Sequence, residues 1–342
     1  MKMMKVAGTL LGLLSALGCG GDDSAGGDSG ASGAAGMTGG SAAGMTGGSS
    51  GTGGGGDPGE LEYAPCAVGT RAGLFSVELD VRFTGIDGDV RDGVDPLLVP
   101  EEVASEGECT LYRSPSLFCD PSCGSGQSCG PDGCIPTPRT QSVGNVTVTG
   151  LVTSPIEMMP RMVGFHYTNP GTLPHPGFEE GAEIALSAAG GEHSAFMLRG
   201  AGVAAVVLPS EPVMVEAGQP AMVTWTAPGV ANDAVRMHIN LDIARHGGTP
   251  ARIECDVPDT GSFAIPEALV TQLVNLGFSG FPALDLVRRS ADSIEVEGLG
   301  CVELEVKAKG RIDAALPGVV SCSSDENCED GQTCEMDMTC SD

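Results

Sequence analysis

The chain has few basic residues, few aromatic residues and no long apolar run. It contains 17 Lys and Arg against 45 Asp and Glu, which gives a formal net charge of -28. Phosphate binding requires a cationic surface, so this composition excludes nucleic acid as a partner. The apolar run at residues 6–17 is shorter than the roughly 20 residues that cross a bilayer. Nine Phe, three Tyr and one Trp supply few platforms for stacking sugars, which disfavours a lectin without excluding it.

Motifs that identify common enzymes are also missing. The sequence has no G-x-S-x-G and no H-E-x-x-H motif, and residues 277–280 approach the first only with the wrong spacing. No two cysteines have the C-x2-C spacing that is typical of structural zinc sites. We therefore expect a protein without catalytic activity and without a cofactor, apart from the calcium hypothesis given below.

The first 18 residues have the three parts of a bacterial export signal. Lys2 and Lys5 give a positive start, an apolar run follows, and small residues precede Cys19. The string Ala16-Leu17-Gly18-Cys19 resembles the lipobox of bacterial lipoproteins. The resemblance implies that Cys19 carries a lipid such as palmitate and becomes the mature N-terminus. It also implies sorting to the outer membrane, because Gly20 rather than Asp follows Cys19. The alternative is an ordinary secreted protein.

Residues 19–60 form a Gly-rich and Ser-rich segment that cannot build a core. An eight-residue unit repeats in tandem at residues 34–41 and 42–49, and the few charges are acidic. This composition predicts a flexible, disordered tether with a reach of roughly 35 Å. Anionic headgroups repel an acidic chain. We therefore expect the N-terminal lipid, rather than a basic patch, to hold the protein on its membrane.

Cysteine is plentiful, with 13 residues. Setting Cys19 aside for the lipid leaves an even number, and an even number in an exported chain predicts disulfides. The cysteines expected in disulfides are Cys66, Cys109, Cys119, Cys123, Cys129, Cys134, Cys255, Cys301, Cys322, Cys328, Cys334 and Cys340.

A short cysteine motif occurs twice. Residues 123–129 match residues 328–334, and each copy has one further Cys on either side. A four-cysteine unit of this size has no core, so two disulfides must hold each unit, in any of three pairings. The two units lie at residues 119–134 and within residues 313–342. They resemble small Cys-rich repeats of bacterial surface proteins, which implies a structural or adhesive role.

Residues 61–172 predict a first β region. Apolar and polar residues alternate at residues 73–83, which indicates a half-buried antiparallel strand. A Gly/Asp turn follows, and then a short strand at residues 109–112 that a Cys66–Cys109 disulfide could staple. Another alternating strand is expected at residues 143–151, so the first Cys-rich unit is an insertion between strands.

Residues 173–312 predict a second β region. Short strands bounded by turn residues favour an antiparallel sandwich, and Pro266 and Gly277 suit the ends of one short helix at residues 266–276. The region resembles an immunoglobulin-like or fibronectin-like sandwich. That resemblance implies a strand that buries Trp225 and a bridge between Cys255 and Cys301. The expected strands are residues 183–188, 195–199, 221–226, 235–243, 252–257, 293–297 and 302–309.

Three groups of residues are candidates for chemistry. The first is residues 259–262, whose Asp-Thr-Gly-Ser resembles the motif of aspartic proteases. Those enzymes need two carboxylates that share one proton, and the sequence has no second copy of the motif. The preferred interpretation is a turn, with Asp259 and Gly261 chosen for its geometry.

The second group is Asp87, Asp89, Asp92 and Asp95. Four carboxylates within nine residues, with glycines for tight turns, could wrap a calcium ion. The spacing departs from the EF-hand, which would place a ligand at Arg91. A solvated hairpin turn is therefore the preferred interpretation.

The third group lies on the strand expected at residues 235–243. Its apolar residues alternate inward, so His238, Asn240 and Asp242 share the other face, with His246 just beyond. A transition-metal or sugar site could be built there, although a solvated sheet face is the preferred interpretation.

The sequence thus predicts a mainly β, disulfide-rich protein held by a lipid in the bacterial cell envelope, either periplasmic or surface-exposed. Its expected role is a structural one or an interaction with a protein or glycan partner. One alternative is an envelope hydrolase with Asp259 or His238 in its site. The other is an adhesin that depends on a divalent cation.

Overall fold

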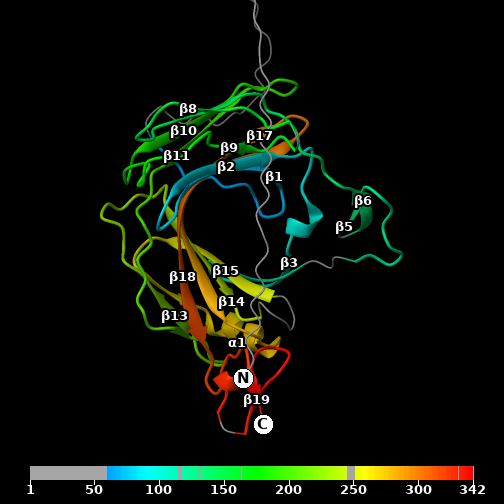
Figure 1. Cartoon of the computed structure of the whole chain (residues 1–342), viewed down its shortest axis with the longest axis vertical. Helices are drawn as coiled ribbons and strands as arrows, with labels where there is room; N and C mark the ends of the chain where they lie inside the picture. Colours follow the sequence, from blue (N-terminus) through cyan, green and yellow to red (C-terminus); the bar gives the residue numbers. More distant parts are fainter. Residues whose placement is uncertain are drawn as a thin grey trace, which may run out of the picture. The chain divides into compact units, whose positions relative to one another are not determined.

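A computed structural model describes residues 60–114, 118–130, 132–162, 164–244, 251–329 and 331–341, without the side chain of Leu97. The described residues form a mainly β protein (Figure 1) with one α-helix, α1 (Glu267–Asn275), and two short 3-10 helices, η1 (Pro96–Leu98) and η2 (Asp325–Asn327). The predicted fold class is confirmed. The expected export signal, Cys19 and almost all of the tether lie outside the described residues, as does His246. Within the described ranges, no helix is both long and apolar enough to cross a membrane.

A ten-stranded sheet runs through the folded part. Neighbouring strands of this sheet are antiparallel, except that β18 is parallel to β1 and to β12. The strands expected in the two β regions meet here, since β1 lies beside β18 and β4 lies beside β15. In spatial order the strands are β3 (Glu101–Glu106), β4 (Cys109–Arg113), β15 (Ala251–Pro258), β14 (Arg236–Asp242), β17 (Ala283–Val296), β18 (Gly300–Ala315), β1 (Arg71–Leu79), β2 (Thr84–Val90) and β9 (Tyr167–Thr168), with β12 (Val213–Met214) beside the end of β18.

A second, four-stranded antiparallel sheet covers one end of the large sheet. Its order is β11 (Phe196–Ala201), β10 (Glu183–Ala188), β7 (Val146–Thr149) and β8 (Ile156–Met158). Apolar side chains from both sheets share one core, which includes Phe75, Val306 and Leu186, all fully buried. Burying each of these side chains stabilises the fold by about 1.5–3 kcal/mol.

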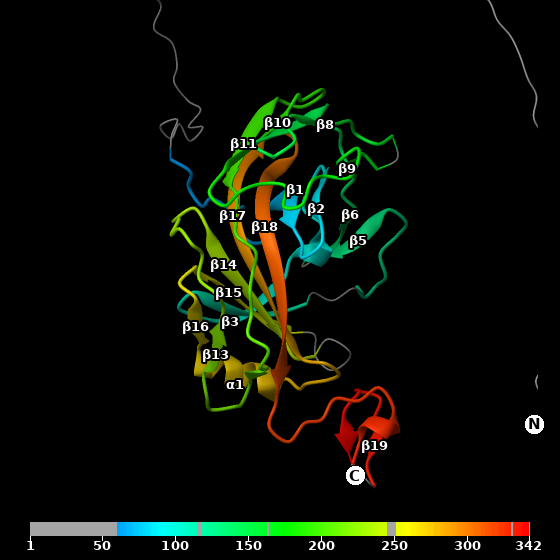
Figure 2. The same cartoon turned by 60° about the vertical axis from the view of Figure 1, so that its left-hand side comes forward.

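A separate core lies under the other end of the large sheet. The two-stranded sheet of β13 (Ala221–Thr224) and β16 (Ser262–Ile265) covers it together with α1, which buries Leu269, Val270 and Leu273. The helix lies one residue inside each end of the predicted range, and Gly277 ends it with a φ of 105°. Figure 2 shows β17 and β18 running from the four-stranded sheet to the helical end.

The long strands give the large sheet one apolar and one polar face. On β18 the even-numbered residues 302–308 belong to the first core, and Ile312 and Ala314 belong to the second. Because side chains alternate along a strand, Glu303, Glu305 and Lys307 point to the opposite face. Both cores therefore lie on one side of the sheet, and the charged residues of β18 line the other.

The β1–β2 hairpin differs from the expected arrangement. The strand predicted to reach residue 83 ends at Leu79, and the predicted Gly/Asp turn is partly strand β2, which continues to Val90. Glycine within β2 misled the sequence interpretation. Gly88 packs under the ring of Phe75, where a Cβ would clash, so this glycine serves packing rather than a turn.

All twelve expected disulfide cysteines are paired, but two predicted partners are wrong. Cys66 bonds Cys301 and Cys109 bonds Cys255, so neither a Cys66–Cys109 nor a Cys255–Cys301 bridge exists. Cys109 and Cys255 face each other on adjacent strands, β4 and β15. The bridge expected from the immunoglobulin-like resemblance is therefore absent.

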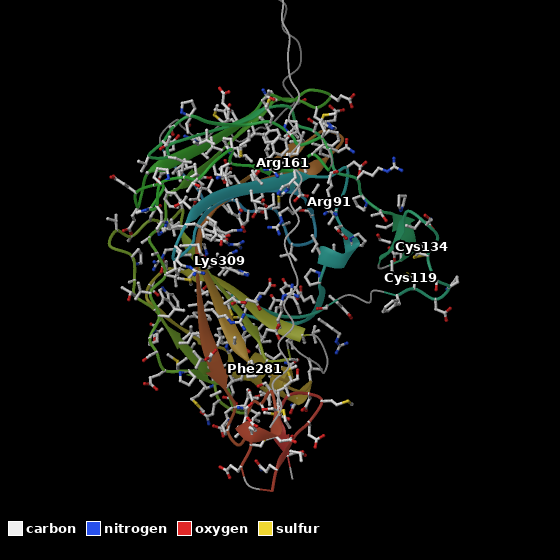
Figure 3. All side chains as sticks on the ribbon, in the orientation of Figure 1. Arg91, Cys119, Cys134, Arg161, Phe281 and Lys309 are labelled. Atoms are coloured by element: carbon white, nitrogen blue, oxygen red, sulfur yellow. A yellow bond between two sulfur atoms is a disulfide. The ribbon has the colours of Figure 1, made fainter. Side chains whose placement is uncertain are left out.

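The two Cys-rich units have the same internal structure. In each, the first cysteine pairs with the third and the second with the fourth. In the first unit, Cys119 therefore bonds Cys129 and Cys134 bonds Cys123; Figure 3 labels Cys119 and Cys134. In each, the third and fourth cysteines also face each other in a small hairpin. The predicted repeat and its two disulfides per copy are confirmed. The hairpins are β5 (Gln127–Gly130) with β6 (Gly133–Pro136) and β19 (Thr333–Cys334) with β20 (Cys340–Ser341).

Candidate functional site

A cleft of about 490 Å³ lies on the polar face of the large sheet. Its floor is made by β18, β17, β14, β15 and β4, and its walls include residues 65–69 and the loop that carries Leu98 and Pro100. Lys309 of β18 lies on the inner side of this curved sheet (Figure 3). The volume is within the range of small-molecule sites, which is roughly 300–1,000 Å³.

Charge is distributed very differently in the cleft and in the whole chain. The chain has 45 acidic residues against 17 Lys and Arg, whereas the cleft is lined by five of each sign. Basic residues are therefore concentrated here. The charged residues that line it are Arg71, Arg252, Arg289, Lys307, Lys309, Glu108, Glu254, Asp256, Glu303 and Glu305.

Glu305 is the centre of a buried ion network. Its carboxylate lies 2.7 Å from Nη1 of Arg289 and 2.8 Å from Nζ of Lys307. Burial by itself would raise the pKa of Glu305, but Lys307 and Arg289 outweigh burial and lower it to about 2. Glu305 is therefore ionised at neutral pH.

Glu303 stands next to Glu305 and has the opposite shift. It accepts a hydrogen bond of 2.8 Å from the backbone N–H of Cys66 and lies 3.4 Å from Nη1 of Arg71. Burial and the neighbouring Glu305 charge raise the pKa of Glu303 despite these partners. Two adjacent carboxyl groups on one strand thus differ in proton affinity.

Tyr63, at the start of the described chain, covers one end of this network. Its hydroxyl donates a hydrogen bond of 2.5 Å to Oδ2 of Asp256. The ring lies 5.9 Å from Cζ of Arg236 and 5.8 Å from Cζ of Arg289, within the range of cation–π contacts. The backbone N–H of Ala64 donates to the carbonyl of Ala291, which fastens this segment to β17.

These contacts shift the pKa of both partners of the Tyr63 hydrogen bond. Burial raises the pKa of Tyr63, although Arg289 opposes the shift. Burial acts in the same direction on Asp256, but Arg289 and the Tyr63 hydroxyl outweigh it and lower the pKa of Asp256. The tyrosine therefore donates as a neutral phenol to an ionised carboxylate.

The alternation predicted around His238 is confirmed. Met237, Ile239 and Leu241 are fully buried in the core, so His238 and Asn240 lie on the polar face. His238 lines the cleft and Asn240 follows it along β14. The predicted neighbour His246 falls outside the described residues, so the expected group is described only in part.

Three buried polar atoms in this area have no hydrogen-bond partner among the described residues. They are Nδ1 of His238, Oδ1 of Asn240 and Nε of Arg289. Burial first, and then the nearby Arg289 charge, lower the pKa of His238, so its imidazole is neutral. A buried polar atom without a partner is costly, by about 1–3 kcal/mol, and therefore requires an explanation such as a ligand.

Asp259 takes part in a buried contact with Arg288 and Trp225. Its carboxylate lies 2.5 Å from Nε of Arg288 and accepts a hydrogen bond of 2.6 Å from Nε1 of Trp225. Gly261 has a φ of 97°, which agrees with the turn that was the preferred interpretation. Trp225 follows the end of β13 instead of lying on the strand, and its ring is buried in the second core.

The four carboxylates of the calcium hypothesis do not converge. Asp87 and Asp89 lie on strand β2. Asp87 pairs with His166 at 2.7 Å, and Asp89 pairs with Arg91 at 3.3 Å. Arg91 also holds Asp95 at 2.8 Å, and Asp92 accepts the backbone N–H of Arg139. Each carboxylate therefore has a partner within the protein, and Asp89 and Asp95 share Arg91.

Cysteine sulfurs form the clusters nearest to metal-site spacing in the described part of the chain. The two groups belong to the Cys-rich units, and every member is in a disulfide, which leaves no thiolate to bind a metal. The groups are Cys119, Cys123 and Cys134, and Cys322, Cys328 and Cys340.

Sequence reasoning found His238 but missed Tyr63, Arg289, Glu303 and Glu305. The alternation at residues 302–309 already placed the charges of β18 on one face. What the sequence lacked was any sign that this face is hollowed.

In comparisons with known proteins, no family model matches the chain and no curated protein matches it.

Proposed function

We propose that this protein is a lipid-anchored, non-catalytic interaction protein of the bacterial cell envelope, and that the cleft is its binding site. The observation that carries the proposal is the set of buried, unpartnered polar atoms on the polar face of the sheet. Two of these atoms, Nδ1 of His238 and Nε of Arg289, belong to side chains that line the cleft. A partner that supplies hydrogen bonds to them removes their desolvation cost.

The anchor part of the proposal rests on the lipobox-like string that ends at Cys19 and on the acidic composition. A lipid at Cys19, with residues 20–59 as a tether, places the folded part near the outer membrane in spite of its charge. The test is Cys19→Ser in the full chain. We expect the variant to move from the membrane fraction to the soluble fraction with an unchanged melting temperature. Continued sedimentation with membranes would show that the lipid interpretation is wrong.

Neither hydrolase candidate is favoured by the geometry. Asp259 is engaged by Arg288 and Trp225, away from the cleft. Nδ1 of His238 lacks the carboxylate that orients the base in a catalytic pair. Panels of peptides, esters and glycans should therefore show no turnover with the purified protein.

The binding role is tested with the full-length Cys19→Ser protein and isolated envelope fractions. We expect the immobilised protein to retain material from one fraction that has been freed of membranes, and Lys309→Glu, at the cleft, to reduce that binding severalfold. Arg161→Glu is the matched control, because Arg161 is exposed and does not line the cleft. Equal binding by both variants, or no binding by the parent protein, would overturn the proposal.

A further inference from the structure

We infer that the cleft binds a neutral oligosaccharide. This inference rests on the proposed function, because it names the ligand of the same site. It is carried by three features of the cleft: the pairing of its charges, the chemistry of its unpartnered atoms, and the position of its tyrosines.

The charges of the cleft are already paired with one another. Arg289 holds Glu305 at 2.7 Å and Asp256 at 2.8 Å, and Lys307 holds Glu305 at 2.8 Å. At these groups, a charged ligand would meet a group of its own sign beside each group of the opposite sign. A neutral ligand leaves these pairs intact and avoids that repulsion.

The unpartnered atoms need a ligand group that both donates and accepts hydrogen bonds. Of the two that belong to side chains lining the cleft, Nε of Arg289 can only donate, and Nδ1 of a neutral His238 can donate or accept, depending on its tautomer. A hydroxyl group meets both requirements. The paired carboxylates also retain free lone pairs, since each oxygen can accept more than one hydrogen bond.

Two of the three tyrosines of the chain are at this site. Tyr112 lines the cleft, and Tyr63 contacts Arg236 and Arg289 at its end. Aromatic rings present an apolar face that accepts the C–H face of a sugar ring. Tyr112 is the aromatic residue that lines the cleft, whereas the ring of Tyr63 contacts two arginines beside it. Apolar walls are added by Leu74, Leu98 and Pro100.

A peptide fits this site less well. Peptides that bind sheets usually add a strand to an open edge, where unpaired backbone groups are available. The cleft lies mainly over β14, β17 and β18, and each of these strands has a neighbour on both sides. Recognition must therefore come from side chains, as it does for a sugar.

The test is calorimetry with the full-length Cys19→Ser protein. The probes are neutral fragments of glucan, mannan, galactan and xylan, acidic oligogalacturonate, basic chitosan oligomers, and a pool of short peptides. We expect binding of at least one neutral fragment, with an affinity that changes less than about twofold between roughly 0.05 and 0.5 M salt. This measurement needs no variant and so does not depend on one folding.

Two variants place the ligand in the cleft. His238→Leu removes both ring nitrogens, and Arg289→Lys keeps the charge but removes Nε. We expect each to weaken binding by about five- to tenfold, the effect of one lost hydrogen bond. His193→Leu and Arg161→Lys, outside the cleft, should leave the affinity unchanged.

The outcomes separate this inference from the proposed function. Salt-sensitive binding of the acidic or basic oligomers, or binding of peptides that His238→Leu weakens, would overturn the neutral sugar and leave the cleft as the binding site. No binding of any probe, together with no cleft-dependent binding of envelope fractions, would overturn both.

Discussion

Arg288 and Arg289 are neighbours on β17, but their side chains serve two different regions of the molecule. Arg288 points to the side of the cores, where its side chain is 1% exposed. Its five N–H groups make five hydrogen bonds, two of them to Asp259 and the others to backbone carbonyls. The carbonyls belong to Ala204, Ala205 and Thr226, so one guanidinium joins three separate segments to the sheet.

Arg289 points to the cleft and is less completely bonded. It makes hydrogen bonds to Glu305 and Asp256, and its Nε has no partner. Arg288 is buried and Arg289 is 14% exposed, but both are paired with carboxylates, so charge does not distinguish their roles. The difference lies in the satisfaction of their hydrogen bonds. A fully bonded arginine supports the fold, whereas one with a free donor at a cleft can bind a ligand.

The largest expected effect comes from the fully bonded arginine. Arg288→Met should lower the free energy of unfolding by about 3–5 kcal/mol, because it leaves the Asp259 carboxylate buried without its cation. Urea unfolding followed by fluorescence of Trp225, the single Trp of the chain, measures the change. A loss below about 1 kcal/mol would mean that solvent reaches Asp259 and that the contact is not structural.

Arg289→Met should have a smaller effect on stability and a larger one on binding. Glu305 keeps Lys307, and Asp256 keeps Tyr63, so we expect a loss of about 1–3 kcal/mol. Binding to the cleft should be lost as well. The comparison of the two arginines would fail if Arg289→Met were the more destabilising substitution, or if Arg288→Met alone abolished binding while folded.

The ion network on the cleft side should also make stability depend on pH. The folded pKa of Glu305, about 2, lies below its ordinary value near 4.5. Its contribution is therefore present above pH 4.5 and is lost as the pH falls from 4.5 toward 2. Lys307→Met weakens the cause of this shift, so its unfolding free energy should fall less steeply over that range. Equal slopes for the variant and the parent protein would contradict the assignment.

The smallest expected effect comes from Tyr63, at the edge of the cleft network. Tyr63→Phe keeps the ring between Arg236 and Arg289 but removes the hydrogen bond to Asp256, which should cost about 1 kcal/mol. The pKa of Asp256, followed by NMR, should rise, since the hydroxyl helps to lower it. Tyr63→Leu, which also removes the ring, should cost more. If the two variants are equal, the contacts of the ring with the arginines contribute nothing.

Much of the fold follows from local patterns. Alternation at residues 183–188 predicts β10 with its observed bounds, and β14 is predicted within one residue at each end. The long strand β17 is harder to predict from the sequence. Only residues 293–297 were expected, whereas the strand begins at Ala283. Arg288 and Ser290 occupy positions of the core face there, so the apolar alternation is interrupted where those polar side chains find buried partners.

The sequence by itself determined much of the strand pattern, the helix, the two matching Cys-rich units, and the need to pair twelve cysteines. These features depend on residues that are close in the chain, so local spacing predicts them. Only the tertiary structure decided that Cys66 bonds Cys301 and that Cys109 bonds Cys255. It also decided that Arg288 is structural and that Arg289 faces a cleft. The disulfide pairings depend on contacts between residues more than a hundred positions apart. The roles of the two arginines depend on what each side chain meets on its face of the sheet. Such contacts exist only once strands distant in sequence lie side by side.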